Sequence, residues 1–453
     1  MDRVKKISEI IVLLFFAAVL FWPVFNLATF TGKNIQQWLN VVFDPVILSI
    51  VKISVFQAGL STLVSVLVGV PLGLWLVLDQ RVRLILSFPF TVPTLVAVMS
   101  WMTWLGGTSL LYSLWSVVLA HVFFNIPWVA LIVAEAHAQV SLQQKEAAAL
   151  LGAGRWACMR WVVWPHVRWA VLSAFCQVFA FCLMSFAIVM VLGGGPPVQT
   201  LESALYSRIR FGTVDLMGAL ACASWQTVLT MIPWIIVFFI EKKMKSQQAQ
   251  SLLLQGVQNL SKKSSKIMLI GALFWVLPYF AVFSVSSQTF LSTRWEQVLD
   301  AWASSMILAF LVGAFTLAIA IMGVSLSRNQ RYQYLSLFYV LPGGISVLVL
   351  SLGLWLSYSS WINPYEGSLP ILILLQCFLF LPFAYRMLWS VSQNRSDRLL
   401  DAARTLGASS WRAFWWVEWP KYRAVVLAVF SLVAGASLGE VAAISFFGGE
   451  GFI

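Results

Sequence analysis

The sequence predicts an all-α polytopic membrane protein built from two homologous helical-bundle halves. Three observations carry this prediction: apolar runs long enough to cross a bilayer, a bias in the placement of lysine and arginine, and an internal repeat. Of the 453 residues, 60% are hydrophobic and 10% are charged, against roughly 25% charged in an ordinary soluble domain. A soluble globule cannot cover so much apolar surface, so soluble enzymes, disordered tails and disulfide-rich secreted modules are excluded.

Apolar runs of about 20 residues are needed to cross a bilayer, and eleven segments meet this requirement. They are 10–30, 53–78, 84–105, 110–134, 169–192 and 216–240 in the first half, and 267–286, 302–326, 335–358, 369–390 and 424–447 in the second. The first run follows a basic N-terminus, as a secretory signal does. It is longer than a signal core and has no small-residue cleavage site, so we expect it to be retained as a span.

The placement of lysine and arginine predicts the orientation of these spans. With the N-terminus in the cytoplasm and sides alternating, most of the 29 basic residues lie inside. The outer loops hold Lys33, Arg208, Arg210 and Arg294. This bias is the positive-inside rule. The net charge of +12 is therefore expected to face anionic membrane lipid, and no nucleic-acid partner is expected.

Residues 141–168 and 396–423 are two copies of one segment. The first has the sequence SLQQKEAAALLGAGRWACMRWVVWPHVR and the second SDRLLDAARTLGASSWRAFWWVEWPKYR. Both halves enter the membrane from the same side, which predicts a parallel repeat with its axis along the membrane normal. We expect a first half over 1–240, a cytoplasmic linker over 241–266 rich in Gln, Ser and Lys, and a second half over 267–453.

The second half ends one span earlier than the first. By the repeat, Ile453 corresponds to Val198, so the sixth span has no counterpart. Either the chain is C-terminally truncated or the second half works with one span fewer. We expect truncation, because the final residues GGEGFI have no basic anchor and resemble the start of an interrupted loop.

Each copy of the repeat predicts a helix–turn–helix elbow between two spans: the first elbow, 141–168, and the second elbow, 396–423. Ser141 is placed to cap a helix, and Gln144 completes a capping-box pattern. Gly152 then ends the helix, as a left-handed cap does. Small alanine faces with one fixed carboxylate suit docking into a partner's groove. An interfacial elbow without a partner is the alternative.

The two elbows resemble the EAA loops of ABC-importer permeases. The matching residues are Glu146, Ala147, Ala148, Gly152 and Pro165 in the first elbow, and Asp401, Ala402, Ala403, Gly407 and Pro420 in the second. Departures are Asp401 in place of Glu, and Trp164 and Trp419 where an aliphatic residue is usual. The resemblance implies a type I importer pore with no catalytic residue of its own. It also implies a cytoplasmic ATPase subunit on each elbow, two copies in all, and a periplasmic substrate-binding protein.

The sequence contains no recognisable nucleotide or metal site. It has no GxxxxGK[ST] loop, and the three histidines show no metal-ligand spacing. The five cysteines form no CxxC pair and are expected within helices as small apolar residues. We therefore expect ATP and Mg on the partner ATPase, and neither a cofactor nor a metal on this chain.

Residues 119–127, 185–206 and 437–452 are similar to permeases for thiamine, with fused permeases for iron(III) as the alternative. Either substrate is a small cationic solute. Glu440 is an acidic residue inside an apolar run, where a charge costs about 2.5–3.5 kcal/mol on insertion scales. Its repeat counterpart is Ser185. Such a carboxylate suggests a path that favours cations, whereas a salt bridge or an interhelical hydrogen bond is the alternative.

Other polar residues in the spans are weaker candidates for that path. They are Gln177, Asn125 and His121, and such side chains often serve as hydrogen bonds between membrane helices. With Glu440 and Ser185, the residues Gln177 and Asn125 complete the expected substrate path.

Two other classes of protein stay open at this stage. An ion-coupled secondary transporter also uses internal repeats, but it does not need paired elbows. A membrane-embedded enzyme would need clustered His, Asp or Glu in its spans, which the sequence lacks. The prediction is therefore a permease of a bacterial ABC importer, multi-pass in the inner (cytoplasmic) membrane.

Overall fold

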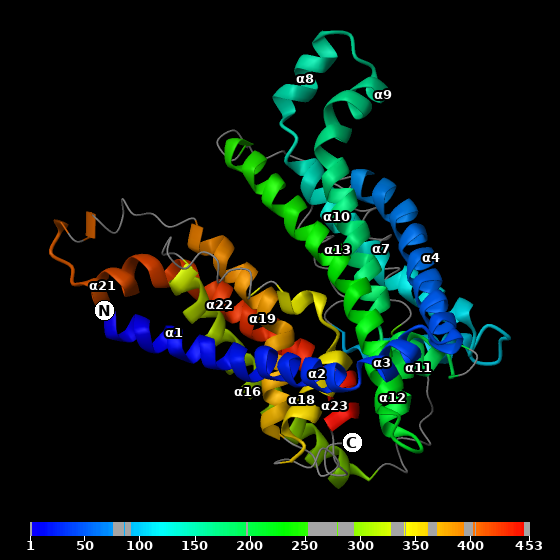
Figure 1. Ribbon diagram of the computed structural model, residues 1–453. Helices are drawn as coiled ribbons and strands as arrows, with labels where there is room; N and C mark the ends of the chain where they lie inside the picture. Colours follow the sequence, from blue (N-terminus) through cyan, green and yellow to red (C-terminus); the bar gives the residue numbers. More distant parts are fainter. Residues whose placement is uncertain are drawn as a thin grey trace. The chain divides into compact units, whose positions relative to one another are not determined.

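Figure 1 shows the computed structural model of the chain. It describes residues 2–75, 86, 92–195, 198–251, 279, 294–327, 339, 341–360, 369–393, 402–403 and 405–447. Every regular element in these ranges is helical. This is expected of a spanning protein, because a helix satisfies all its backbone hydrogen bonds internally where no water is available. The all-α prediction is confirmed.

The chain divides into two compact units. Unit 1 contains residues 1–35 and 293–453, and unit 2 contains residues 36–292. These units differ from the expected halves at both boundaries, since the first 35 residues belong with the second half of the sequence and unit 2 extends to residue 292 rather than ending at 240. Part of the expected linker, 241–251, continues a long helix.

Unit 2 contains four long helices joined by short ones. The long helices are α4 (Pro45–Trp75), α7 (Leu114–Ala138), α10 (Trp164–Leu183) and α13 (Leu216–Ser251). The short elements are α3 (Ile35–Val42), α6 (Thr94–Leu105), α8 (Leu142–Leu150), α9 (Arg155–Cys158), the π-helical turn η2 (Met159–Val163), α11 (Ala187–Leu192) and α12 (Leu201–Arg210). Helices α4, α7 and α10 pack on one another around a buried apolar cluster, which forms the core of the unit.

Two glycines bring α4 and α7 unusually close together. A Cβ atom added at Gly69 would lie 2.7 Å from the Val129 side chain, and one added at Gly73 would lie 2.6 Å from the Ala130 carbonyl oxygen. Small residues four apart allow membrane helices to pack backbone against backbone. Helices α4 and α7 therefore form a tightly packed pair.

Unit 1 combines N-terminal helices with helices of the second half. They are α1 (Asp2–Phe16), η1 (Ala17–Phe21), α2 (Trp22–Lys33), α16 (Trp295–Ser327), η5 (Leu341–Gly344), α18 (Val347–Tyr358), α19 (Leu369–Gln393), α21 (Ser410–Ala413), η6 (Phe414–Glu418), α22 (Trp419–Leu438) and α23 (Val441–Phe447). Helices α16, α19 and α22 pack on one another, as α4, α7 and α10 do in unit 2.

Buried contacts explain why the N-terminal helices belong to unit 1. The ring of Phe16 is almost fully buried and lies edge-on to Tyr339, with 5.4 Å between ring centroids. The Tyr358 hydroxyl donates to the Ala18 carbonyl oxygen at 2.9 Å. Burial of these aromatic rings against one another is favourable. It holds the N-terminal segment on helices of the second half.

The described helices confirm most of the expected spans. Seven are long and apolar enough to cross a membrane, and an eighth span exists if the bent pair α22–α23 counts as one. The expected spans 84–105 and 335–358 are represented by the shorter apolar helices α6 and α18. The expected span 267–286 lies outside the described residues apart from Tyr279.

Two of the expected spans are interrupted. In 169–192 the chain leaves the helix after Leu183, and in 424–447 it bends by 52° after Leu438. Hydropathy cannot reveal such breaks, because the residues on both sides are apolar.

The repeat extends to the helix boundaries. Helices α7 and α19 have 25 residues each, and α10 and α22 have 20 each. In both halves a five-residue π-helical turn precedes the 20-residue helix, just before Pro165 in α10 and Pro420 in α22. Proline has no N–H, and its ring clashes with the carbonyl four residues earlier. A π-helical turn absorbs that clash without ending the helix.

Candidate functional site

The first elbow projects from one end of unit 2 as a hairpin of α8 and α9 (Figure 1). The Ser141 Oγ accepts a hydrogen bond from the Gln144 N–H at 3.2 Å, so the predicted cap is present. At the far end of α8, Gly152 has φ +83°, and the Ala153 N–H donates to the Ala148 carbonyl oxygen at 3.0 Å. This is the Schellman pattern, and glycine adopts its left-handed conformation at no steric cost.

The second elbow turns in the same way. Gly407 has φ +82°, and the Ala408 N–H donates to the Ala403 carbonyl oxygen at 3.0 Å. Ala402 and Ala403 are helical, whereas Asp401 lies outside the described residues. The two elbows therefore share one backbone geometry.

Both elbows expose large apolar side chains. In the first elbow the exposed fractions are 89% for Leu150 and Leu151 and 77% for Trp156; in the second they are 88% for Leu406 and 82% for Trp416. The predicted residues Glu146 and Ala147 are exposed beside these leucines, and Ala148 and Pro165 are half-buried. Apolar groups gathered on an exposed elbow are typical of a surface that contacts a protein partner or a membrane.

The residues proposed for the substrate path lie at or near the two broken spans. Ser185 occupies the gap between α10 and α11, and Glu440 occupies the gap between α22 and α23. Both side chains are half-buried. The repeat counterparts Ser185 and Glu440 therefore occupy equivalent breaks, one in each unit.

The Glu440 carboxylate caps the start of α23. Its Oε1 accepts from the N–H groups of Ala442 and Ala443 at 3.0 and 3.4 Å. A side-chain oxygen at this position satisfies donors that the first helical turn leaves free. Glu440 thus has a structural task besides any contact with a cation.

The other predicted path residues bond to neighbouring helical groups. Gln177 Nε2 donates to Ser173 Oγ at 2.9 Å within α10. Asn125 Nδ2 donates to the His121 carbonyl oxygen at 2.8 Å and approaches Cys182 Sγ at 3.5 Å. Gln177 and Asn125 are both buried, and of these contacts the one between Asn125 and Cys182 joins two helices, α7 and α10, as polar side chains in membranes often do.

Sequence reasoning missed a polar stripe on α4. Gln57 makes a side-chain hydrogen bond with His121 of α7. Ser54, Ser61 and Ser65, spaced three or four residues apart around Gln57, are also buried. That spacing places them on one helix face, and it is the signal by which the stripe could have been found inside an apolar run.

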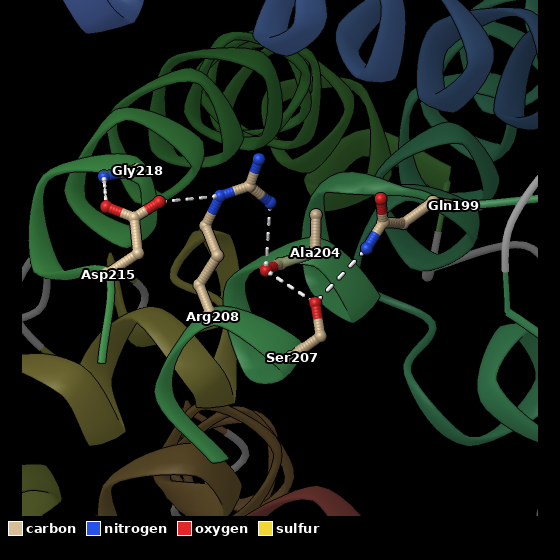
Figure 2. Close-up of polar contacts among 6 residues, drawn as sticks. All are labelled: Gln199, Ala204, Ser207, Arg208, Asp215 and Gly218. Atoms are coloured by element: carbon tan, nitrogen blue, oxygen red, sulfur yellow. Dashed lines mark hydrogen bonds and ion pairs between the residues drawn. The ribbon is translucent and has the colours of Figure 1, made fainter. Parts of the chain in front are cut away.

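An ion pair fixes the corner between α12 and α13, at the end of unit 2 opposite the first elbow (Figures 1 and 2). Arg208 Nε lies 3.3 Å from Asp215 Oδ2, and Asp215 Oδ1 accepts from the Gly218 N–H at 2.9 Å. Arg208 Nη1 also donates to the Ala204 carbonyl oxygen at 3.2 Å. Of these residues, the sequence analysis singled out only Arg208, as a basic residue of an outer loop.

Comparison with known proteins assigns this architecture to a class. The chain matches the family described as "Binding-protein-dependent transport system inner membrane component" over residues 61–246 and 316–452. These two segments make up more than half of the chain and include both elbows. The chain belongs to this family, and it is a multi-pass inner membrane permease with two fused halves.

Individual relatives resemble the chain over most of its length. It is 29% identical to the thiamine transport system permease protein ThiP of Haemophilus influenzae, covering 92% of this chain and 83% of that protein. It is 25% identical to ThiP of Escherichia coli, covering 92% and 84%. The sulfate transport system permease protein CysW of Escherichia coli is 24% identical and covers 49% of this chain and 81% of its own length. These relatives are transport permeases, so the prediction of an ABC-importer permease is confirmed.

Proposed function

We propose that this chain is the thiamine-translocating pore of a bacterial ATP-driven importer that receives its substrate from a periplasmic binding protein. The observation that carries the proposal is the similarity to permeases named for thiamine transport, which spans 92% of the chain. Iron(III), the other substrate expected from the sequence, is the alternative.

The two elbows provide the contact with the ATPase. Leu151 and Leu406 occupy the same position of the repeat and are almost fully exposed. Burying a leucine contributes about 1.5–3 kcal/mol, so one leucine on each elbow suits one ATPase subunit per half. Two ATPase copies then lie in the cytoplasm, and the positive-inside bias places the N-terminus on the same side.

Transport requires that ATP and the loaded binding protein favour one state of the pore over another. A ligand shifts a conformational equilibrium only by its difference in affinity for the two states. ATP binding draws the ATPase subunits together and moves the elbows, while the binding protein engages the opposite face. Hydrolysis, with ATP and Mg held by the ATPase, resets the pore. The permease chain itself supplies no catalytic group.

The breaks at Ser185 and Glu440 are the proposed substrate path. The Glu440 carboxylate uses Oε1 to cap α23, and its negative charge is available to attract a cation. Asn125 supports the path by bonding α7 to Cys182 of α10, and Gln177 lies on α10 with its side chain bonded to Ser173. A charge held inside the membrane is costly and commonly functional.

Reconstitution tests this proposal directly. The permease is placed in proteoliposomes with its ATPase and binding protein, and uptake of labelled thiamine is measured with and without ATP. We expect ATP-dependent uptake of thiamine, and no such uptake of thiamine phosphates or ferric iron. Uptake of ferric iron alone would select the alternative substrate. Uptake driven by an ion gradient without the ATPase would instead place the chain among secondary transporters.

A further inference from the structure

A polar contact at the base of the first elbow joins α8 to α7. Lys145 Nζ, on α8, lies 3.2 Å from His137 Nε2, in the last turn of α7. Burial and the charge of Lys145 lower the pKa of His137, and the backbone of Leu74, in the last turn of α4, opposes this shift. The imidazole therefore bonds to α8 and lies beside the end of α4.

The chemistry of the two side chains assigns their roles. An ammonium group can only donate, so Nε2 of His137 accepts from Lys145, and the other ring nitrogen carries the proton of the neutral imidazole. Burial lowers the pKa of Lys145, and nearby Cys158 of α9 opposes this shift. Lys145 is thus half-buried at the base of the elbow, whereas the next residue, Glu146, is exposed.

The two helices at His137, α4 and α7, are already locked together. The close approach at Gly69 and Gly73 leaves no space for a side chain between α4 and α7. His137 lies about one turn beyond this contact, where α7 leads into the first elbow. A displacement of α8 that reaches His137 is therefore passed to a tightly packed helix pair.

The second elbow has a different base. The repeat counterparts of His137 and Cys158 are Ser392 and Ala413. Ser392 Oγ donates to the Trp389 carbonyl oxygen at 2.8 Å, within its own helix α19. The counterpart of Lys145 is Leu400, which lies outside the described residues and carries no charge. The sequence therefore supplies the His–Lys pair to the first elbow only.

We infer that His137 is a positioning residue that couples the first elbow to the α4–α7 pair during the transport cycle. Movement of α8 reaches these spans through the Lys145–His137 hydrogen bond as well as through the peptide chain. This inference rests on the proposed function, because it takes the elbows to be driven by the ATPase.

The test uses the complete complex of permease, ATPase and binding protein in proteoliposomes. ATP hydrolysis is measured with and without loaded binding protein, together with thiamine taken up per ATP. His137→Leu removes the hydrogen bond with Lys145 and leaves an apolar side chain in its place. We expect its stimulation by the binding protein and its uptake per ATP to fall about tenfold, a typical size for coupling between sites. Basal hydrolysis and the yield of complex should stay unchanged.

Two further variants separate coupling from folding. His137→Gln keeps one donor and one acceptor, so it should restore most of the stimulation. Ser392→Ala is the matched change in the second half and should behave as the wild type. Lys145→Met should lose coupling as His137→Leu does, and combining the two should add little, because contacting residues are not independent.

Several results would overturn the inference. They are full coupling in His137→Leu, failure of His137→Gln to restore stimulation, or a parallel loss of basal hydrolysis and complex yield. A wild-type complex whose hydrolysis responds to the binding protein, but which takes up no thiamine, would contradict the proposed substrate. In that case the ratio of ATP hydrolysis with and without binding protein would still measure the coupling role of His137.

Discussion

The two elbows share a backbone but not the side chains around it. Each turns on a left-handed glycine and runs through a π-helical turn into a Trp-Pro pair. The first elbow carries Leu150 where the second carries Thr405, and its base holds a His–Lys pair where α19 has Ser392. The geometry that presents a docking surface is thus common to both halves, while the connection to the membrane helices differs. Two similar ATPase subunits would therefore move the membrane helices through different side-chain contacts in the two halves.

The two broken spans show a similar contrast. The same break holds Ser185 in unit 2 and Glu440 in unit 1, so one half alone contributes a carboxylate there. The repeat therefore duplicates the backbone geometry, whereas the side chains at the breaks differ between the two halves.

The largest effect is expected from removing the shared docking surface. Leu151→Asp combined with Leu406→Asp replaces two exposed leucines and should weaken ATPase binding by about 100-fold or more, since each buried leucine contributes about 1.5–3 kcal/mol. Co-purification of the ATPase and ATP-driven uptake both measure this loss. Val214→Asp, an exposed change at the opposite end of unit 2, is the control. Retained ATPase in the double variant would show that the leucines are not the contact.

The glycine turn gives the next effect. Gly152→Val forces a β-branched side chain into φ +83°, at a cost of roughly 1–2 kcal/mol, so the first elbow should bind the ATPase about 5- to 30-fold more weakly. Gly154→Ala is the matched control, because its φ is −64° and nothing lies within 4 Å of an added Cβ. Affinity of the detergent-solubilised permease for the ATPase is the measurement. Equal affinities for the two variants would contradict the turn's role.

The contrast between the breaks predicts a smaller, substrate-specific effect. Glu440→Gln keeps an oxygen that can cap α23 but removes the charge, so uptake of cationic thiamine should fall several-fold while complex yield is unchanged. Ser185→Ala, the matched change in unit 2, should alter uptake less than twofold. Initial uptake rates at several thiamine concentrations test both. If Glu440→Gln transports normally, the residue serves only as a helix cap.

The smallest effect concerns the end of unit 2 opposite the first elbow. A Cβ at Gly218 would lie 2.1 Å from Asp215 Oδ2 and 2.6 Å from Arg208 Nε, so Gly218→Ala should break the ion pair and cost about 1 kcal/mol, the upper end for an exposed pair. We expect the melting temperature in detergent to drop by a few degrees, with ATPase affinity unchanged. Asp215→Asn, which loses the charge but keeps an acceptor for α13, should lose less. An altered ATPase affinity would mean that the two ends of the unit are not separable.

The elbows were predictable from sequence because their structure is local. Ser141 caps α8 and Gly152 ends it through hydrogen bonds between residues at most five apart. Most spans follow equally directly from apolar runs, since a bilayer leaves the helix as the main solution for such a segment. The repeat supplied the second elbow without further assumptions.

Contacts between distant residues were decided only by the tertiary structure. The sequence of 1–35 does not say which bundle its apolar face joins, and that depends on contacts such as Phe16 with Tyr339. Likewise, nothing local to His137 reveals that its ring bonds to Lys145 and lies beside the backbone of Leu74. Backbone turns and apolar runs are fixed by interactions a few residues long, whereas helix partners are chosen by side-chain fit across the whole bundle. The sequence by itself therefore determined the elements and the class of protein, and tertiary packing determined how the elements are coupled.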